Sequence, residues 1–216
     1  MKLLVLSTIR KLKVVAGTVK KYLYNDKNDE VQLVESEMYK LKLADFSCLI
    51  DQETGMAGHL LFLYNLTRET KSKNIIEIGL GGANSAIAFL LALKSNRGKL
   101  ISIDCNPKKE AIERIKNLRF EKNWELLEGF SQEVVNKIPK NLKIDILLID
   151  GKHSYNQCKL DYKLYEPMVK NGGFILFHDS AIIKGVIKFT NKLKKELPEC
   201  LHLPYCNGIF MVRKTW

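Results

Sequence analysis

Apolar positions from residue 74 onward fall into short runs that alternate with stretches of helical periodicity. The first run, Asn74 to Ile78, is rich in β-branched residues, ends at a glycine-rich turn and indicates a buried strand. Four later runs predict further strands: Lys99 to Asp104, Trp124 to Glu128, Ile144 to Asp150 and Phe174 to Phe177. Because strands alternate with helices, the pattern predicts an α/β fold with a mostly parallel sheet.

Helical periodicity occupies the intervals around these strands. The predicted helices are Met56 to Lys71, Ala86 to Lys94, Pro107 to Leu118, Tyr155 to Val169 and Ile182 to Leu197. In the last helix the residues expected to face the core are Ile182, Val186, Phe189 and Leu193. A glycine turn at residues 171–173 precedes the fifth strand, and a Cys206-Asn207 turn near the end predicts an antiparallel hairpin.

The first 24 residues carry six lysine or arginine residues and no acidic residue, and their apolar positions recur at close to 3.6 residues. This pattern predicts a basic amphipathic helix with a break near Gly17. Such a helix can pack on the rest of the chain, form a contact in a homo-oligomer or lie on an anionic membrane, and we favour the first two. We expect an N-terminal helical extension over residues 1–55 and one main domain over residues 56–216.

Length and composition fit one α/β domain with a full core. No apolar run approaches the ~20 residues that span a bilayer, and Arg10 interrupts the apolar start too early for a signal peptide. The five cysteines are scattered and form no C-x-x-C pair, so no disulfide framework is indicated. We therefore expect a cytoplasmic location, with peripheral membrane contact through residues 1–24 as the alternative.

The net charge of +11 raises the hypotheses of nucleic-acid and membrane binding. The lysines, however, are spread along the whole chain, which favours ordinary solvated lysine-rich faces. Nucleic acid is therefore not the partner that we expect.

The turn after the first strand indicates which ligand the fold would bind. Within N-I-I-E-I-G-L-G-G-A-N-S, Gly79 and Gly81 let the backbone approach a ligand, and Ser85 is expected to cap the next helix. Dinucleotide folds need a third glycine where Asn84 stands. Glu77, at the end of the strand, would also repel a pyrophosphate and attract a cation. The turn therefore favours a cationic ligand over a dinucleotide.

The pattern E-x-G-x-G resembles the first motif of the class I S-adenosylmethionine-dependent methyltransferases, whose methyl donor carries two positive groups and no phosphate. The resemblance covers about residues 56–216 and implies a Rossmann-like fold with a seven-stranded, mostly parallel sheet and a reversed last strand. The donor-binding residues that it implies are Glu77, Gly79, Gly81, Ser85, Asp104, Phe130, Ser131 and Asp150.

Two of these positions have specific expected roles. Asp104 ends the second strand and matches the second methyltransferase motif in position, where an acid accepts hydrogen bonds from ribose hydroxyls. Phe130 and Ser131 follow the third strand, where the resemblance places the adenine. Asp104 as a simple helix cap and Ser131 as an N-cap are alternatives that stay open.

The stretches D-G-x-H-x-Y, beginning at Asp150, and G-G-x-I-x-x-H-D, ending at Asp179, are similar to a narrower branch. This branch includes the cephalosporin-hydroxylase-like and macrocin-type O-methyltransferases, which share a metal-dependent mechanism with the catechol O-methyltransferases. Ser180 stands where the catechol type places an Asn ligand, so the identity of a third ligand stays open.

Asp150 and Asp179 end strands that should be neighbours, so both carboxylates are expected at one edge of the sheet. Paired carboxylates repel each other unless a cation joins them, and hard oxygen ligands suit Mg²⁺. A hydroxyl group on such a metal becomes more acidic, and His153 can take its proton as a general base or, alternatively, orient the substrate. We assign His178 as a further metal ligand, with core packing as its alternative.

The sequence thus predicts O-methylation of a hydroxyl group on a small molecule or sugar, with S-adenosylmethionine as donor and Mg²⁺ as the metal. An RNA methyltransferase would need an added RNA-binding module or an N-P-P-Y-type motif, and neither is present. A non-catalytic scaffold of the same fold is the third hypothesis. The four strand-end acids, Glu77, Asp104, Asp150 and Asp179, argue against it.

Overall fold

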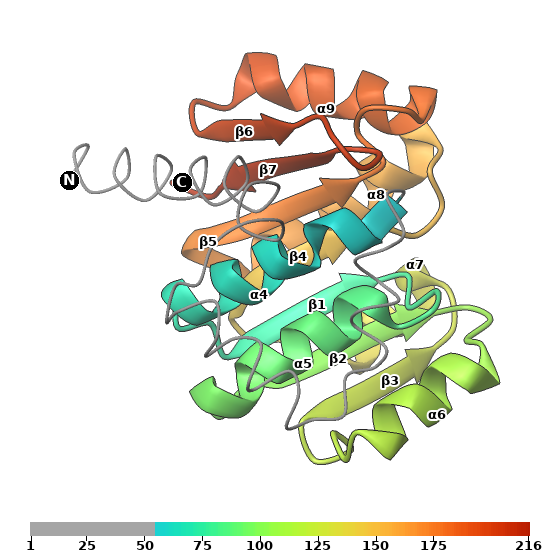
Figure 1. The fold of residues 1–216 in the computed structure, drawn as a ribbon. Helices are drawn as coiled ribbons and strands as arrows, with labels where there is room; N and C mark the ends of the chain where they lie inside the picture. The colour runs from blue at the N-terminus through green and yellow to red at the C-terminus, as the bar shows by residue number, and fades with distance from the viewer. Residues whose placement is uncertain (1–54) are drawn as a thin grey trace, which may run out of the picture. The chain divides into compact units, whose positions relative to one another are not determined.

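A seven-stranded sheet forms the centre of residues 55–216, the residues that the computed structural model describes (Figure 1). Its strands are β1 (Asn74–Ile78), β2 (Lys99–Asp104), β3 (Trp124–Glu128), β4 (Ile144–Ile149), β5 (Val169–His178), β6 (Cys200–Leu203) and β7 (Ile209–Arg213). They lie in the order β3-β2-β1-β4-β5-β7-β6. Neighbours from β3 to β5 run parallel, whereas β7 is antiparallel to β5 and β6. The predicted Rossmann-like sheet with a reversed last strand is confirmed.

Helices cover both faces of this sheet (Figure 1). One face carries the 3₁₀ helix η1 (Gly55–His59) with α4 (Leu60–Glu69), α5 (Asn84–Asn96) and α6 (Lys109–Asn117). The other carries α7 (Ser131–Val134), η2 (Val135–Lys137), α8 (Tyr155–Tyr165), η3 (Glu166–Met168) and α9 (Lys184–Glu196). Helices α4 and α5 pack on each other, as do α8 and α9. The domain is therefore a three-layer sandwich with its parallel strands buried on both sides.

Helix α5 is apolar around its whole circumference, and residues 85–93 are all buried. A helix with no polar face is stable only when it is enclosed, and here it lies between the sheet and α4. The glycine turn that leads into α5 is consequently anchored to a part of the molecule that packing holds in place.

The strand ends are tied together by backbone hydrogen bonds at the carboxyl edge of the sheet. The N–H of Gly79, after β1, donates to the carbonyl of Ile103 over 2.7 Å. The N–H of Asp150, after β4, donates to the carbonyl of Ile78 over 2.8 Å. The loops that carry the predicted donor motif and the predicted metal ligands therefore start side by side.

Strand β5 corrects the prediction of a turn at residues 171–173. The strand begins at Val169 rather than Phe174, and the glycines lie inside it. Gly172 has a φ of +83°, and the register with β4 shifts between Ile144 and Ile146. Two consecutive glycines here form an irregularity within a strand, which has the same sequence signature as a turn.

Helix α9 is shorter at its start than predicted, and Ile182 lies outside it with 54% of its surface exposed. The prediction that Ile182 faces the core is therefore wrong, whereas Val186, Phe189 and Leu193 are buried as expected. The N–H of Ile182 donates to the carbonyl of Asp179 over 3.3 Å, so this residue belongs to a turn that precedes the helix.

We expect Gly79→Ala to destabilise the domain by about 2–5 kcal/mol, the combined cost of backbone strain and overpacking. Gly79 has a φ of +99°, and a Cβ atom there would lie 2.2 Å from the carbonyl oxygen of Asp150. Gly82→Ala is the matched control, because a Cβ there would meet only Arg114, at 3.9 Å. Denaturant unfolding of both variants measures the difference, and an unchanged midpoint for Gly79→Ala would contradict the expectation.

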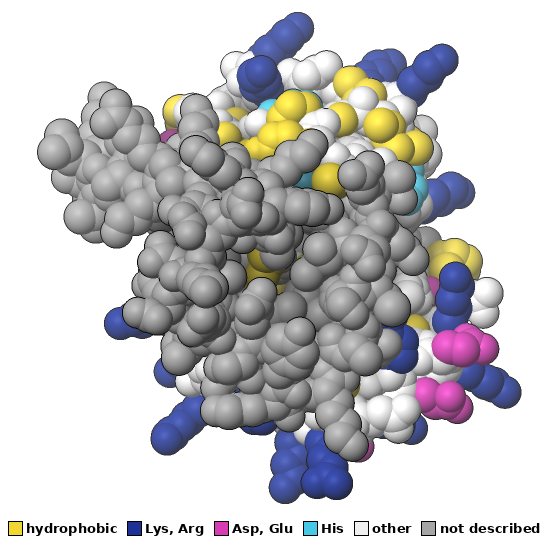
Figure 2. Space-filling view, in the orientation of Figure 1, with side chains coloured by type: hydrophobic (Ala, Val, Ile, Leu, Met, Phe, Trp, Pro, Cys, Tyr) yellow, Lys and Arg dark blue, Asp and Glu magenta, His cyan; other side chains and the backbone are white. Residues whose placement is uncertain are grey.

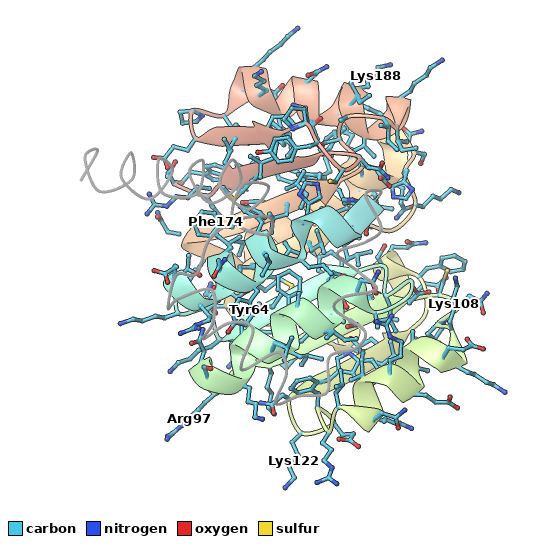
Figure 3. The ribbon with its side chains drawn as sticks, in the orientation of Figure 1. Tyr64, Arg97, Lys108, Lys122, Phe174 and Lys188 are labelled. Atoms are coloured by element: carbon cyan, nitrogen blue, oxygen red, sulfur yellow. The ribbon has the colours of Figure 1, made fainter. Side chains whose placement is uncertain are left out.

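The basic side chains of the described residues lie on several different elements. Figure 3 labels Arg97 after α5, Lys108 before α6, Lys122 before β3 and Lys188 on α9, and all four project outward. In Figure 2 the visible lysine and arginine side chains stand at several places around the rim of the molecule. This distribution agrees with the prediction that the lysines are spread over solvated faces.

The amphipathic helix predicted over residues 1–24 lies outside the described residues and stays a prediction. The sequence also predicts a second helix over residues 31–43, and it too lies outside them. Within residues 55–216, no helix has both the length and the apolar character needed to cross a bilayer.

Candidate functional site

Asp104, at the end of β2, holds the glycine turn that follows β1. Its Oδ2 accepts hydrogen bonds from the N–H groups of Leu80 (2.9 Å) and Gly81 (3.3 Å), and its Oδ1 accepts one from Asn106 (2.9 Å). It does not cap α6, whose N-cap residue is Lys108. A Cβ atom on Gly81 would meet no atom within 4 Å, so the turn borders open space. Its backbone is thus fixed on one side and accessible to a ligand on the other.

Glu77, the acid of the E-x-G-x-G motif, is fully buried rather than turned toward a ligand. Its two oxygens accept hydrogen bonds from Ser85 Oγ (2.8 Å) and Ser102 Oγ (2.6 Å). Burial raises the pKa of Glu77 to about 8, although both hydrogen bonds act to lower it. The carboxyl group of Glu77 is therefore enclosed by the protein, and its role in binding the methyl donor stays a prediction.

Ser85 was expected to cap α5, and this expectation is wrong. The N-cap position is Ala83, which has a φ of +66° and makes no side-chain cap. Ser85 is the second residue of the helix, and its hydroxyl donates to Glu77 instead of accepting from a backbone N–H. The serine therefore links the glycine turn to the buried acid.

Phe130 and Ser131, after β3, differ sharply in exposure. Phe130 is 55% exposed and occupies the N-cap position of α7, so Ser131 is not the cap. Ser131 is buried and donates through Oγ to Asp161 Oδ1 over 2.5 Å, while its carbonyl accepts from Tyr165 over 2.7 Å. Asp161, on α8, thus holds the start of this loop and leaves the Phe130 ring at the surface. Asp161 follows the D-G-x-H-x-Y motif in sequence, but only the structure places it beside Ser131.

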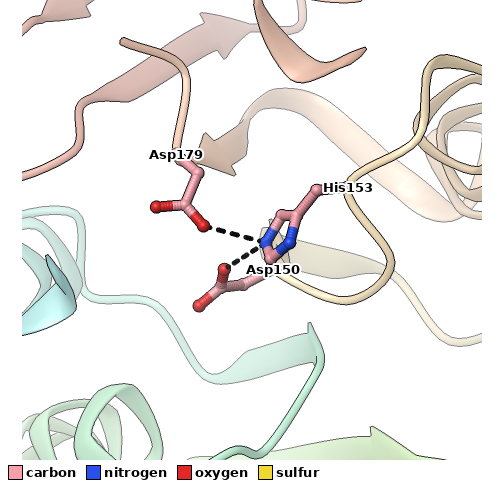
Figure 4. Close-up of side chains that lie close together, drawn as sticks. All are labelled: Asp150, His153 and Asp179. Atoms are coloured by element: carbon pink, nitrogen blue, oxygen red, sulfur yellow. Dashed lines mark hydrogen bonds and ion pairs between the residues drawn. The ribbon is translucent and has the colours of Figure 1, made fainter. Parts of the chain in front are cut away.

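Asp150, His153 and Asp179 meet at the carboxyl edge of the sheet (Figure 4). His153 Nε2 lies 3.3 Å from Asp150 Oδ1 and 2.9 Å from Asp179 Oδ2. The three residues come from loops after β4 and β5, which are neighbouring strands as predicted. Asp179 has a φ of +58°, a left-handed conformation that Asp tolerates better than most residues. Motifs that lie far apart in sequence therefore supply one cluster.

The imidazole of His153 compensates the charge of both carboxylates. Hydrogen bonds to Asp150 and Asp179 raise the pKa of His153 to about 10 against the opposing effect of burial. Burial raises the pKa of Asp179, but the bond from His153 and the nearby charge of His178 outweigh it and leave that pKa below its usual range. At neutral pH His153 therefore carries a proton between the two acids. Its imidazole can serve as a base only when another cation balances them.

His178 contacts both carboxylates of this cluster from the buried side. Its Nδ1 is 3.0 Å from Asp150 Oδ1 and 3.4 Å from Asp179 Oδ1, and its side chain is almost fully buried. Burial lowers the pKa of His178, yet the bond to Asp150 and the charges of Asp150 and Asp179 hold it above its usual value. The position fits a residue that orients Asp150, and the assignment of His178 as a ligand stays a prediction.

His59, on η1, is a site residue that sequence reasoning missed. It is buried, its Nε2 lies 3.0 Å from the carbonyl of Cys206, and its ring meets that of His178 edge-on at 5.9 Å. The ring of Tyr205 stacks on that of His59 with the two centroids 6.2 Å apart. Burial and the neighbouring His178 lower the pKa of His59 to about 4, so it stays neutral. No motif surrounds His59, so the sequence gives no signal that this residue lies beside His178.

The cluster of Asp150, His153 and Asp179, at the acidic edge of the sheet, offers ligand atoms that fit a divalent cation. One ligand atom from each of Asp150, His153 and Asp179 lies within 4.8 Å of the others. Two carboxylates and an imidazole suit a range of divalent metals, and the oxygen ligands suit Mg²⁺. Ser180 follows Asp179, and its Oγ is buried without a hydrogen-bond partner among the described residues. This hydroxyl could therefore bind a further group beside the cluster.

Comparison with known proteins agrees with this geometry. Residues 76–180, which include the glycine turn and the acidic cluster, match the family model described as a methyltransferase domain. These residues form a methyltransferase domain. The recognition of a class I methyltransferase from the glycine motif is thereby confirmed, and the family match covers both motifs.

Relatives of this methyltransferase domain are distant in sequence and close in fold. An uncharacterised protein of Acanthamoeba polyphaga mimivirus is 25% identical over 166 residues, which are 70% of this chain and 74% of that protein. The Podospora anserina methyltransferase PaMTH1, solved with bound SAH, aligns with a TM-score of 0.68 at 15% identity over 89% of this chain and 98% of its own. The O-methyltransferase TomG from Streptomyces achromogenes, solved with SAM, aligns with a TM-score of 0.64 at 15% identity over 92% of this chain and 95% of its own.

Proposed function

We propose that the chain is an S-adenosylmethionine-dependent O-methyltransferase that uses a divalent cation to hold a hydroxyl group of a small molecule or carbohydrate. The observation that carries this proposal is the contact between the two loops. The Asp150 N–H binds the Ile78 carbonyl, and Gly79 lies against the Asp150 carbonyl. A donor over the glycine turn and an acceptor at the acidic cluster would therefore be neighbours, which positions them for direct transfer.

Residues at the carboxyl edge of the sheet would bind three parts of the methyl donor, namely its ribose, its adenine and its amino-acid end. Asp104 retains lone pairs for ribose hydroxyls beyond those used on the turn, and the exposed ring of Phe130 offers a face on which adenine can stack. Gly81 and Ser85 would meet the amino-acid end. The two solved structures named above contain SAM or SAH, which supports the choice of donor.

Chemistry at the acidic edge follows from its charges. A divalent cation between Asp150 and Asp179, which we take to be Mg²⁺, would lower the pKa of an acceptor hydroxyl. His153, next to both acids, would accept the proton of that hydroxyl once its own proton is no longer needed to balance the carboxylates. The chain's main contribution is to align the acceptor oxygen with the donor methyl group.

The decisive experiment measures binding and turnover separately. Calorimetry with S-adenosylhomocysteine tests the donor site, and methyl transfer to a panel of sugars and phenols, with Mg²⁺ or excess chelator, tests the acceptor site. We expect micromolar-scale binding and metal-dependent transfer. Tight binding of NAD instead would overturn the donor assignment, and full activity in excess chelator would overturn the metal assignment.

Asp104→Ala should weaken binding of S-adenosylhomocysteine by about tenfold or more, since hydrogen bonds to a charged group each contribute about 1.5–3 kcal/mol. The substitution removes the expected ribose contact and also the acceptor that holds Leu80 and Gly81. Calorimetry on the folded variant measures the loss. Glu133→Ala, at an exposed acid on α7, is the control that should bind normally. Unchanged affinity in Asp104→Ala would remove this residue from the donor site.

A further inference from the structure

The turn that leads from β1 into α5 holds an unfavourable backbone conformation. Gly81 has a φ of +52° and Ala83 a φ of +66°, so both residues lie in the left-handed region. Ala83 is the N-cap residue of α5, and its methyl side chain cannot accept a hydrogen bond from the helix. A turn with such residues and two adjacent glycines keeps one conformation only when the surrounding structure imposes it. Groups outside the turn must therefore hold it.

Arg114, on α6, is one of these groups. Its Nη1 donates to the carbonyl of Gly82 and, over 3.0 Å, to Oδ1 of Asn84, the first residue of α5. An arginine side chain keeps its charge throughout the physiological pH range, so both bonds are charge-assisted, which is the stronger class of hydrogen bond. Arg114 follows Gly82 by 32 residues in the chain, so the sequence around either residue gives no sign of the contact.

Arg114 and Asp104 hold opposite polar groups of the same turn. Asp104 ends β2, and its Oδ2 accepts from the N–H groups of Leu80 and Gly81. Arg114 lies on α6, the helix that follows β2, and it binds oxygen atoms instead. The acid thus fixes the start of the turn and the base fixes its end, next to α5. A loss at either residue should therefore affect a different part of a ligand that lies over the turn.

The peptide unit between Gly82 and Ala83 is fixed at both of its polar groups. Its carbonyl accepts from Arg114, and its N–H donates to the carbonyl of Leu80 over 2.8 Å. This peptide leads directly into α5, a helix of 13 residues. The first N–H groups of any helix have no partner within the helix, so their direction decides what they can bind. Arg114 thus controls how the amino end of α5 is presented.

We propose that Arg114 is a positioning residue of the donor site, which holds Gly82 and Asn84 so that the turn and the start of α5 fit the amino-acid end of S-adenosylmethionine. The inference rests on the proposed function, because it needs the donor at this turn. Arg114 acts through the turn rather than on the ligand. The ribose and the adenine would be bound by Asp104 and Phe130, so their binding should depend little on Arg114.

Two ligands separate this role from a general loss of structure. S-adenosylhomocysteine has adenine, ribose and an amino-acid end, whereas methylthioadenosine lacks the amino-acid end. Arg114→Met keeps an apolar side chain and removes both hydrogen bonds. Its affinity for S-adenosylhomocysteine should fall by about tenfold, and its affinity for methylthioadenosine should stay within about threefold of the wild type. Calorimetry measures both. Lys116→Met, at an exposed basic residue of the same helix, is the matched control and should bind both ligands normally.

Two further variants test the hydrogen bonds themselves. Arg114→Lys keeps a charged donor and should recover most of the lost affinity for S-adenosylhomocysteine. Asn84→Ala removes one of the two acceptors, so it should weaken S-adenosylhomocysteine binding by less than Arg114→Met does. The double variant should bind no more than about threefold more weakly than Arg114→Met alone, because the bond to Asn84 is already absent there.

Three results would overturn the proposal while donor binding stands. These are wild-type affinity for S-adenosylhomocysteine in a folded Arg114→Met variant, an equal loss for both ligands, and no recovery in Arg114→Lys. Denaturant unfolding shows whether each variant is folded. Should Arg114→Met fail to fold, Asn84→Ala carries the test, and an unchanged preference between the two ligands would then overturn the proposal. A wild-type protein that binds neither ligand would instead refute the proposed function.

Discussion

Asp179→Asn should abolish measurable methyl transfer, with a loss of at least about 10²-fold, while binding of S-adenosylhomocysteine stays within about threefold. The substitution removes one of two charges that would hold the cation, and Lewis-acid stabilisation of this kind is worth several kcal/mol. The backbone should not change, since Asn tolerates the observed φ of +58° as well as Asp does. Asp150→Asn should behave in the same way, because Asp150 is the second carboxylate in contact with His153.

The loss must be separated from general damage to the sheet. Asp145→Asn is the matched control, because Asp145 is a buried acid at the opposite end of β4 that pairs with Lys170 and accepts from the N–H groups of Lys73 and Asn74. It should lose stability and keep turnover per folded molecule. Radiometric methyl transfer with Mg²⁺ titration measures all three variants. If Asp179→Asn retained its rate, or if Asp145→Asn lost it equally, the acidic edge would not be the acceptor site.

His153→Ala should lower the rate at pH 7 by roughly the ~10²–10⁴ attributed to a general base. The loss should shrink toward pH 10, where the acceptor hydroxyl ionises without help. The pKa of about 10 in the ligand-free protein, raised by Asp150 and Asp179, means that His153 gains its basic form as pH rises or as a cation balances the carboxylates. Wild-type activity should therefore rise with pH from the acid side.

A pH–rate profile of both proteins at saturating donor and Mg²⁺ tests the base assignment. His202→Ala serves as the control, since His202 is an exposed residue of β6 outside the cluster. Equal impairment of His153→Ala at every pH would show that His153 orients the acceptor, and the base would then have to be a different group.

Elements whose packing is uniform along the chain could be predicted from the sequence. Strand β4 is buried at every position from Ile144 to Ile149, and its almost wholly apolar sequence is typical of a central parallel strand. The convergence of Asp150 and Asp179 was predictable for a related reason. Carboxyl ends of adjacent parallel strands share an edge whatever the side chains around them are.

Features that depend on strand register could not be predicted. Glu77 appeared to be an acid at an open strand end, because its sequence neighbours do not show that Ser102 of β2 lies beside it and donates to it. Ser85 likewise looked like a helix cap, although its partner is Glu77 rather than a backbone N–H. In each case a contact between two different elements replaced the role that the sequence alone would favour.

The left-handed backbone at Asp179 also bears on how such an enzyme can diverge. At a φ of +58° the fold accepts Gly, Asn and Asp far more readily than branched or bulky residues. The backbone conformation alone therefore limits which residue types can replace Asp179. Among these, Asn removes the charge and preserves the shape. A single inherited change at this position would therefore yield a well-folded homologue that still binds the donor but has lost catalysis, and a fold match alone would not distinguish such a pseudoenzyme from an active relative.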